Sequence, residues 1–256
     1  MSADLSGRIA LITGASRGIG AATVRALRAR GAEVVALSRH PFAQEADTDP
    51  GVHRYSADVG DWESVSAVLS RVLADHPVID VLVNNAGMPG MRAPVWEWDV
   101  QAYRRAAMVN TFGPVYVMRL VMPGMVARAD GVVINVVSGA ADRPRPTRGM
   151  YGSQKAATEH LTRVVAQEAA EHRVRVHAFH PGPVDTALFA SSRSEAELAR
   201  LRAGAGDEPP LQAPAEPAAA LAWLASPAGS AWTDVVVAWR DPRIRAALQA
   251  RPDFAP

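Results

Sequence analysis

Residues 8–20 read RIALITGASRGIG, and this stretch determines how the rest of the chain is interpreted. The apolar run in residues 8–13 has the length of a buried strand, and the apolar residues after it fall at helical spacing. Gly14, Gly18 and Gly20 stand between the two, where the backbone must turn tightly. Such a turn also occurs where a chain only reverses. After a first strand, it predicts a pyrophosphate site at a helix N-terminus.

Short apolar runs alternate with amphipathic stretches along the rest of the chain. Seven such runs predict strands, at residues 8–13, 33–37, 52–57, 79–83, 132–137, 174–179 and 235–239. Strands that alternate with helices form βαβ units, and their right-handed crossovers give a parallel sheet covered on both faces. We therefore expect a single domain over residues 1–256. It should be a Rossmann-type, doubly wound α/β fold with a mainly parallel sheet of about seven strands.

The helical segments are less regular than the strands. Apolar residues suit a long helix over residues 100–126, which Pro114 should bend or interrupt. Ala157, Leu161 and Val164 form the apolar stripe of another helix. Toward the C-terminus the pattern predicts a loop at residues 203–217 and helices at residues 191–202, 218–225 and 242–249.

The composition argues against several classes of protein. The 27 Lys and Arg residues nearly balance 26 Asp and Glu residues, so a net charge of +1 leaves no electrostatic footprint for nucleic acid or a membrane surface. The absence of Cys excludes disulfides and thiolate metal ligands. No apolar stretch reaches about 18 residues, and the first residues lack the pattern of a signal peptide. We expect a soluble, cytoplasmic protein.

Lys155 is the only lysine in the chain, beside 26 arginines. Tyr151 lies one helical turn earlier, so the two side chains share a helix face. A compact ammonium there would favour tyrosinate and lower the pKa of the phenol toward working pH. The pair predicts a proton donor for a carbonyl oxygen. The alternative is chance, because a chain with one lysine must place it somewhere.

The end of the second expected strand indicates which cofactor the glycine turn would serve. An acidic side chain there would bond the ribose 2′-hydroxyl of NAD, but this chain has Ser38 and Arg39. Arg17, in the glycine turn, is within reach of the same place, and two guanidinium groups suit a 2′-phosphate. These residues favour NADP(H). The alternative is that Arg17 and Arg39 are ordinary surface arginines that bind no cofactor.

Polar residues also follow the third and fourth expected strands. Asp58 and Val59 follow the third, where they would meet an adenine ring or where Asp58 would cap the next helix. The tetrapeptide NNAG at residues 84–87 follows the fourth. It lies at the sheet edge where ligands bind in open α/β folds, although as an isolated tetrapeptide it fits a simple turn as well.

Three further features point to the same edge of the sheet. Ser138 ends the fifth strand, 13 residues before Tyr151, so both hydroxyls can reach one carbonyl oxygen. Asn110 lies inside the long helix, where Asn is a poor helix former and must bend the helix or bind something. The stretch PGPVDT at residues 181–186 ends the sixth strand and would enclose a nicotinamide.

Together these motifs resemble the short-chain dehydrogenase/reductase family, in its shorter single-domain branch. TGASRGIG, NNAG, Asn110, Ser138, YGSQK and PGPVDT stand in family order and at family spacing over residues 5–190. The resemblance implies an NADP(H)-dependent oxidoreductase of the ketoreductase type, which moves a hydride between nicotinamide and a carbonyl carbon. It also implies four catalytic roles: Tyr151 as general acid/base, Lys155 on the nicotinamide ribose and lowering the tyrosine pKa, Ser138 on the substrate oxygen, and Asn110 holding a relay water.

The resemblance further implies a cofactor site, and it implies no metal, because Tyr and Ser would polarise the carbonyl. The pyrophosphate would lie on the turn that contains Gly14, Ser16, Arg17, Gly18, Ile19 and Gly20. The 2′-phosphate and the adenine would meet Ser38, Arg39, Asp58 and Val59, together with Arg17. The ribose and nicotinamide would meet Asn85, Ala86, Gly87, Tyr151, Lys155, Pro181, Gly182, Val184 and Thr186.

The C-terminal part departs from the family pattern. Trp239 and Arg240 stand where relatives usually have small residues, in an end that often forms subunit contacts. The expected homo-oligomer is therefore left open as a dimer or a tetramer. Residues 187–217 are expected to form a substrate lid within the domain.

The substrate is a small carbonyl or alcohol compound whose identity and stereochemistry the sequence does not specify. Arg143, Arg145 and Arg148 lie between Ser138 and Tyr151. They either face water or favour an anionic or carrier-linked substrate. Two other functions remain open: an epimerase or dehydratase that uses transient redox, and a non-catalytic NADP(H)-binding sensor or scaffold.

Overall fold

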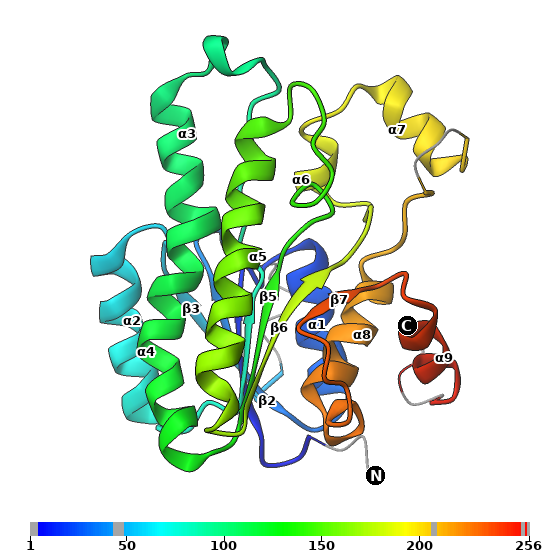
Figure 1. Cartoon of the computed structure of the whole chain (residues 1–256). Helices are drawn as coiled ribbons and strands as arrows, with labels where there is room; N and C mark the ends of the chain where they lie inside the picture. The colour runs from blue at the N-terminus through cyan, green and yellow to red at the C-terminus, as the bar shows by residue number, and fades with distance from the viewer. Residues whose placement is uncertain (1–4, 43–48, 206–208, 252–253, 255–256) are drawn as a thin grey trace.

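A computed structural model describes residues 5–42, 49–205, 209–251 and 254. Seven parallel strands form one sheet in the order β3-β2-β1-β4-β5-β6-β7, with helices on both faces (Figure 1). This arrangement confirms the expected Rossmann-type α/β fold. The strands are β1 (Ile9–Thr13), β2 (Glu33–Ser38), β3 (Val52–Ser56), β4 (Val81–Asn84), β5 (Gly131–Val136), β6 (Val174–His180) and β7 (Val236–Ala238).

The central strands are apolar on both sides because both faces of the sheet are covered. In β1, Ala10 and Ile12 pack into one hydrophobic cluster, whereas Leu11 packs into the other. All three side chains are fully buried. Continuous apolar runs such as IALIT therefore predict these strands better than an alternating pattern would.

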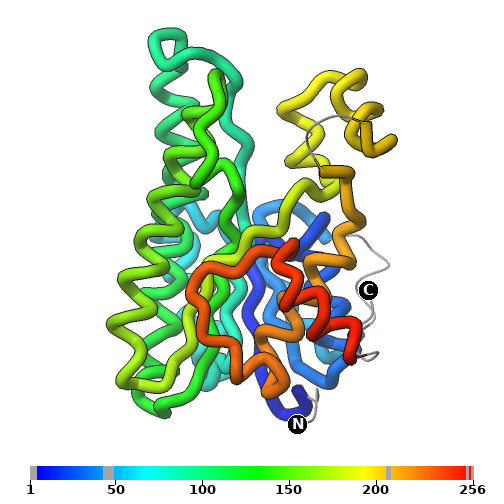
Figure 2. Tube along the Cα trace, turned by 45° about the vertical axis from the view of Figure 1, so that its right-hand side comes forward, coloured from blue at the N-terminus to red at the C-terminus, as the bar shows by residue number. Residues whose placement is uncertain are grey.

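The helices separate into two layers, which the turned view also shows (Figure 2). One layer holds α1 (Gly18–Arg28), α8 (Ala215–Ala225) and α9 (Pro242–Gln249). The other holds α2 (Trp62–Asp75), α4 (Gly113–Arg128) and α5 (Gly149–Ala170). Within the described residues, no helix combines the length and the apolar character needed to cross a membrane. Short 3₁₀ turns, η2 and η4, lie at Val95–Glu97 and Pro227–Gly229.

The strand order reverses at β1, which pairs with β2 on one side and with β4 on the other. At such a point the loops after the two central strands diverge and leave a crevice at the carboxyl edge of the sheet. The glycine turn follows β1, and the NNAG tetrapeptide overlaps the end of β4. The topology therefore brings both motifs to the same crevice.

The long helix expected over residues 100–126 is interrupted, and Pro114 explains where. α3 (Val100–Ala107) leads into a π-helical turn, η3 (Met108–Phe112), before α4 begins. Pro114 has no N–H with which to bond the carbonyl of Asn110. The hydroxyl of Thr158 on α5 donates to that carbonyl at 2.8 Å instead. Asn110 is therefore buried within a π turn rather than within a regular helix.

The C-terminal quarter corrects two predicted boundaries. α7 (Glu195–Arg202) begins four residues later than the helix expected over residues 191–202, and a short helix that was not expected, α6 (Ala187–Ala190), precedes it. α8 already begins at Ala215, so the loop expected up to residue 217 was too long. The loop was expected because residues 203–217 are rich in Gly, Pro and Ala. Pro217 nevertheless lies in the first turn of α8, where proline is tolerated because its missing N–H has no helical partner to lose.

Candidate active site

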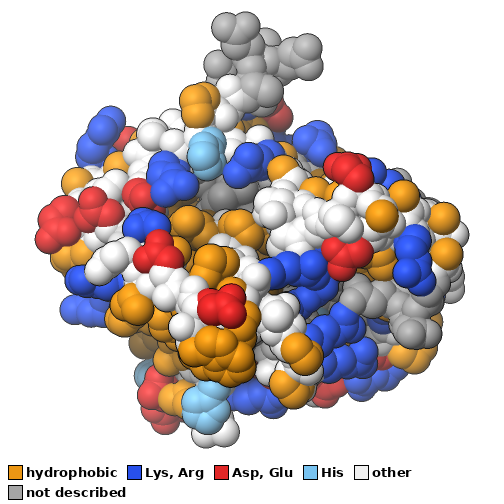
Figure 3. Space-filling view, turned by 90° about the horizontal axis from the view of Figure 1, so that it is seen from above, with side chains coloured by type: hydrophobic (Ala, Val, Ile, Leu, Met, Phe, Trp, Pro, Cys, Tyr) orange, Lys and Arg blue, Asp and Glu red, His pale blue; other side chains and the backbone are white. Residues whose placement is uncertain are grey.

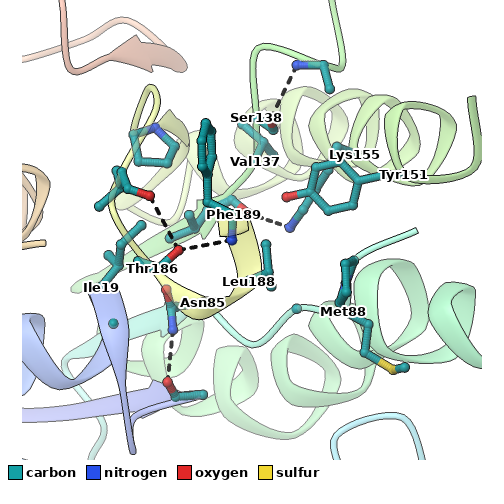
Figure 4. Close-up of a pocket in the computed structure, with 18 of the residues that line it drawn as sticks. Ile19, Asn85, Met88, Val137, Ser138, Tyr151, Lys155, Thr186, Leu188 and Phe189 are labelled. Carbon is teal, nitrogen blue, oxygen red and sulfur yellow. Dashed lines mark hydrogen bonds between the residues drawn. The ribbon is translucent and has the colours of Figure 1, made fainter. Parts of the chain in front are cut away.

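A cavity of about 1150 Å³ opens at the carboxyl edge of the sheet. All of the site residues expected from the sequence line it except Gly20 and Asn110, which are buried. Ser138 comes from the end of β5, Tyr151 and Lys155 from α5, and Thr186 from the start of α6, and all four converge on this space (Figure 4).

The glycine turn fits a closely approaching ligand. Gly14 and Gly18 have φ angles of 65° and 57°, in the left-handed region that favours glycine. A Cβ atom at Gly14 would lie 2.8 Å from the Cα atom of Ala86, and one at Gly20 would lie 2.2 Å from the Gly14 carbonyl oxygen. No described side chain caps the N-terminus of α1, so its first N–H groups can bind an anion such as a pyrophosphate.

Asn85 braces this turn. Its side-chain nitrogen donates to the carbonyl oxygens of Thr13 at 3.0 Å and Gly14 at 3.1 Å. The backbone N–H groups of Asn85 and Ala86 both donate to the Thr13 hydroxyl at 3.0 Å. The Asn85 amide therefore holds β1 and β4 together at the crevice. Only its backbone and its partly exposed edge are left to border a ribose.

The residues expected to recognise the cofactor phosphate lie together after β1 and β2. The Ser38 hydroxyl donates to the Ser16 hydroxyl at 2.8 Å. Arg39 is half-exposed and donates to the Asp58 carboxylate at 3.2 Å. Asp58, which lines the cavity, is therefore already paired with a cation. His40, which directly follows Arg39, also lines the cavity and was not predicted as a site residue.

Lys155 is buried next to Tyr151, with a single hydrogen-bond acceptor among the residues that the structure describes. Its ammonium donates to the Val136 carbonyl oxygen at 2.8 Å and lies 5.8 Å from the centroid of the Tyr151 ring. The side chain is only 4% exposed. Burial lowers the pKa of Lys155 to about 8.

The expected lowering of the Tyr151 pKa is corrected. Burial raises the pKa of Tyr151 to about 12, and a hydrogen bond with the Ser138 side chain opposes this only in part. Loss of hydration disfavours the tyrosinate. Lys155 directs its ammonium at Val136 and not at the phenol oxygen. The phenol consequently keeps its proton at neutral pH.

Asn110 is fully engaged by hydrogen bonds of its own. Its Oδ1 accepts from the Met88 N–H at 2.8 Å. Its Nδ2 donates to the Met88 carbonyl at 2.9 Å and to Gln154 Oε1 at 2.6 Å. Among the described residues, no hydrogen bond joins Asn110 directly to Lys155. Asn110 instead fixes a cavity-lining residue, Met88, and ties the loop after β4 to α5 immediately before Lys155.

Sequence reasoning missed the apolar wall of the cavity. Leu188 and Phe189 of α6 stand over the space with Met88 and Val137, opposite the Tyr151 ring (Figure 4). The adjacent Leu and Phe shortly after PGPVDT were the available signal. They follow PGPVDT after one alanine, so one continuous stretch of chain contributes both segments to the cavity wall.

A buried hydrogen-bonded pair next to the cavity, His180 and Glu159, was also missed. His180 lines the cavity, and its Nε2 lies 2.7 Å from a carboxylate oxygen of Glu159. Arg163 donates to the other Glu159 oxygen at 2.8 Å. Glu159 stands one helical turn after Lys155, on the face of α5 that packs against the sheet. A carboxylate one helical turn after Lys155 was the available signal for this pair.

Comparison with known proteins identifies the family. Residues 8–197 match the family described as short chain dehydrogenase. The L-xylulose reductase of Mesocricetus auratus is 38% identical over 208 residues, which cover 78% of this chain and 82% of that protein. The cis-4-hydroxycyclohexanecarboxylate dehydrogenase of Sinomonas cyclohexanicum is 37% identical over 232 residues, 87% of this chain and 91% of that protein.

Solved structures agree with this assignment. The 3-ketoacyl-(acyl-carrier-protein) reductase from Brucella melitensis, complexed with NADH, has a TM-score of 0.83 and 28% identity, covering 92% of this chain and 97% of its own. A metagenomic short-chain oxidoreductase in complex with NADP has a TM-score of 0.75 and 30% identity, covering 93% and 98%. The chain therefore belongs to the short-chain dehydrogenase family and is an oxidoreductase that interconverts carbonyl and alcohol groups with a nicotinamide cofactor.

Proposed function

We propose that this enzyme is an NADP(H)-dependent carbonyl reductase in which Tyr151 is the general acid. One observation carries the proposal: Tyr151, Ser138 and Lys155 meet in the same cavity as the glycine turn. A bound nicotinamide would supply the hydride for the carbonyl carbon. The side chains then have only to hold the carbonyl oxygen and deliver a proton to it.

The roles of the three side chains follow from their surroundings. Tyr151 donates the proton, because its raised pKa keeps the phenol protonated until the carbonyl oxygen gains negative charge. Ser138 lies beside the phenol and donates a hydrogen bond to the same oxygen. Lys155 supplies a nearby positive charge, which favours the tyrosinate that remains after the transfer. Asn110 positions the cavity wall through Met88.

Preference for NADP(H) over NAD(H) rests on the residues after β2. No acidic side chain stands at the end of β2, where a ribose 2′-hydroxyl would be bound. Arg17, Ser38 and Arg39 line the cavity there instead, and guanidinium groups suit a 2′-phosphate. The cofactors named with the solved neighbours include both NADH and NADP, so the preference depends on these side chains.

We further propose that residues 187–217, of which residues 206–208 lie outside the described part of the chain, act as the substrate lid of a single catalytic domain. α6 contributes Leu188 and Phe189 to the cavity wall, and Arg193 follows before α7. Two of the relatives are named for L-xylulose and for cis-4-hydroxycyclohexanecarboxylate, and one solved neighbour is named for a 3-ketoacyl group on a carrier protein. Small ketones with polar substituents are therefore the first substrates to test.

Tyr151→Phe tests the proposed function. The variant should lose nearly all NADPH-dependent reduction of a ketone panel, because the ring can still pack while the proton donor is gone. NADPH binding, followed by fluorescence, should be retained. Tyr103→Phe is the matched control, since Tyr103 lies outside the cavity and its hydroxyl makes only a 3.5 Å contact with Ser153.

The same assay separates the alternatives. One NADPH consumed per alcohol formed supports a reductase. Product formation without net NADPH consumption would instead indicate an epimerase or a dehydratase. A Tyr151→Phe variant as active as the wild type at neutral pH would refute the acid/base assignment. NADPH binding without turnover on the whole panel would favour a sensor or scaffold.

A further inference from the structure

Positive charge is concentrated around the candidate active site. Of the described residues that line the main cavity, eight are Arg and one is Lys, against three Asp. Seen from above the carboxyl edge of the sheet, basic side chains form a contiguous group to the right of centre (Figure 3). The whole chain has a net charge of only +1, so this concentration is a local property of the site.

Arg148 is the central member of this group. It directly precedes α5, three residues before Tyr151, and its side chain lines the cavity while it is half-buried. Among the described residues, its guanidinium has no hydrogen-bond acceptor and no ion-pair partner. Burial lowers the pKa of Arg148, and the charges of Arg92 and Arg145 lower it further. Such a group is stabilised when an anion comes within reach.

The Arg92 guanidinium already binds a carboxylate of the protein. Arg92 lies in the loop after β4, and its Nη1 donates to both carboxylate oxygens of Glu197, at 3.2 and 3.3 Å. The Glu197 side chain is 47% exposed and is also held by the Ser194 N–H at 2.9 Å. A carboxylate of the protein therefore already occupies the outer side of the basic group. Because the pair is solvent-exposed, it contributes little stability and can exchange partners.

Arg193 connects this group to the lid. Its guanidinium lies 3.4 Å from the centroid of the Phe189 ring, which itself borders the cavity. Burial lowers the pKa of Arg193 to about 10, and the charges of Arg148 and Arg92 act in the same direction. A second cavity, of about 520 Å³, is lined by both Arg92 and Arg193. The three arginines thus come from separate segments and face one connected space.

We propose that Arg148, Arg92 and Arg193 form a subsite for an anionic group, a carboxylate or a phosphate, carried by the carbonyl substrate. This inference rests on the proposed function, because the subsite opens into the cavity that holds Tyr151. Guanidinium groups bind such oxyanions with paired, charge-assisted hydrogen bonds. The set differs from the three arginines expected from the sequence: Arg143 is exposed, and two members come from other loops.

The first test measures binding and needs no turnover. Cyclohexanecarboxylate and cyclohexanecarboxamide are titrated by calorimetry into the protein saturated with NADPH. The acid should bind at least tenfold more tightly than the amide, and this preference should weaken as NaCl is raised. Arg148→Gln should reduce the preference about tenfold, and Arg92→Gln should reduce it independently. Arg71→Gln, an exposed arginine on α2 outside the cavity, is the charge-matched control.

The second test uses turnover to separate the two anion classes. The paired substrates are 4-oxocyclohexanecarboxylate with its carboxamide, and acetoacetyl-CoA with the N-acetylcysteamine thioester, which lacks phosphate. The kcat/KM ratio should favour the charged member of one pair, and Arg148→Gln should reduce that ratio about tenfold. Ratios near one in the wild type, or ratios unchanged in Arg148→Gln and Arg92→Gln, would overturn the subsite. Absence of any ketone reduction would refute the proposed function, while the binding test would still decide the subsite.

Discussion

At the scale of single residues, the site depends on side chains whose size and charge both matter. Within the described part of the chain, the Lys155 ammonium has one hydrogen-bond acceptor, the Val136 carbonyl oxygen, and its side chain has almost no contact with solvent. An arginine has the same charge but a broad planar group with five donors. In this space most of those donors would be buried without acceptors.

We therefore expect the Lys155→Arg variant to be much less active than the wild type, although the substitution keeps the positive charge. Each buried donor without a partner costs about 1–3 kcal/mol, so kcat/KM for ketone reduction should fall about a hundredfold or more. Steady-state assays with NADPH provide the measurement, and a thermal melt shows whether the variant is folded. Near-normal activity in a folded Lys155→Arg protein would show that any cation suffices.

The pH dependence of reduction should report the same lysine. Since burial lowers the pKa of Lys155 to about 8, its positive charge is present below pH 8 and is lost as the pH rises through that value. The Tyr151 phenol, with a pKa of about 12, stays protonated over this range. We predict that kcat/KM for reduction declines above pH 8 when NADPH is saturating. A flat profile from pH 7 to 10 would exclude an essential lysine charge.

Arg39→Asp should change the cofactor preference. The substitution removes one charge-assisted contact to a 2′-phosphate and places a carboxylate next to Asp58, the present partner of Arg39. The loss corresponds to about 1.5–3 kcal/mol, or about tenfold to a hundredfold in NADPH affinity. Titrations of both cofactors with the wild type and the variant measure the change. Arg25→Asp, at an exposed position of α1, controls for net charge, and a wild type that prefers NAD(H) would contradict the assignment.

Residue types and their order along the chain predicted which residues meet at the candidate site, because these groups lie at strand ends that a parallel sheet brings together. They did not give the direction of the Tyr151 pKa shift. That direction depends on how deeply the phenol is buried and on where the Lys155 ammonium points, and spacing along a helix determines neither. Arg92 and Arg193 were missed for a similar reason, since they approach Arg148 only through tertiary packing.

At the scale of secondary-structure elements, the π turn between α3 and α4 connects helix geometry to the site. Pro114 leaves the Asn110 carbonyl without its helical partner, and Thr158 replaces that partner from α5. The same turn places the Asn110 side chain against Met88 and Gln154. One irregularity in a helix therefore holds three segments of the cavity wall together.

Thr158→Val should destabilise the protein by about 1–3 kcal/mol, because the replacement has nearly the same shape but leaves a buried carbonyl without a donor. Urea unfolding monitored by circular dichroism measures this difference. Thr158→Ser keeps the hydroxyl and serves as the matched control. Since the π turn positions Met88, Thr158→Val should also raise the KM for a ketone. Equal stability of the wild type and the Val variant would mean that the bond to Asn110 contributes nothing.

The elements themselves were largely predictable, since uninterrupted apolar runs and helical stripes mark them directly. The errors lie around the lid. A capping box at Ser194 separates α6 and α7, and its pattern was not used. α8 is almost wholly buried and rich in Ala, so it has no polar face from which its start could be located. Boundaries of this kind depend on which neighbours cover the helix.

At the scale of the whole molecule, buried polar groups as well as the apolar core hold the strands and helices together. Asn84 on β4 donates to Asn135 on β5 at 2.9 Å, and Asn135 donates to Thr162 on α5 at 3.0 Å. These bonds fix α5 above the strand ends that carry the site. The oligomeric state and the cytoplasmic location expected from the sequence stay predictions.

His177, in β6, should make the fold sensitive to acid. Burial lowers its pKa from 6.5 to about 4, the charge of Arg175 acts in the same direction, and its Nδ1 pairs with the Asp234 carbonyl at 2.9 Å. A lowered pKa means that the unfolded chain binds the proton more readily than the folded one. The contribution of neutral His177 to the free energy of unfolding is therefore fully present above pH 6.5 and is lost as the pH falls toward 4.

The loss from His177 alone should reach about 3 kcal/mol at pH 4, at about 1.4 kcal/mol per pH unit. Free energies of unfolding from urea titrations between pH 7 and pH 4 measure it. His177→Asn keeps a side-chain N–H near the Nδ1 position but cannot be protonated, so its stability should fall less steeply below pH 6.5. His160→Asn, at an exposed position of α5, is the control and should follow the wild type. If His177→Asn and the wild type lose stability in parallel down to pH 4, then other groups cause the acid sensitivity and His177 is not its source.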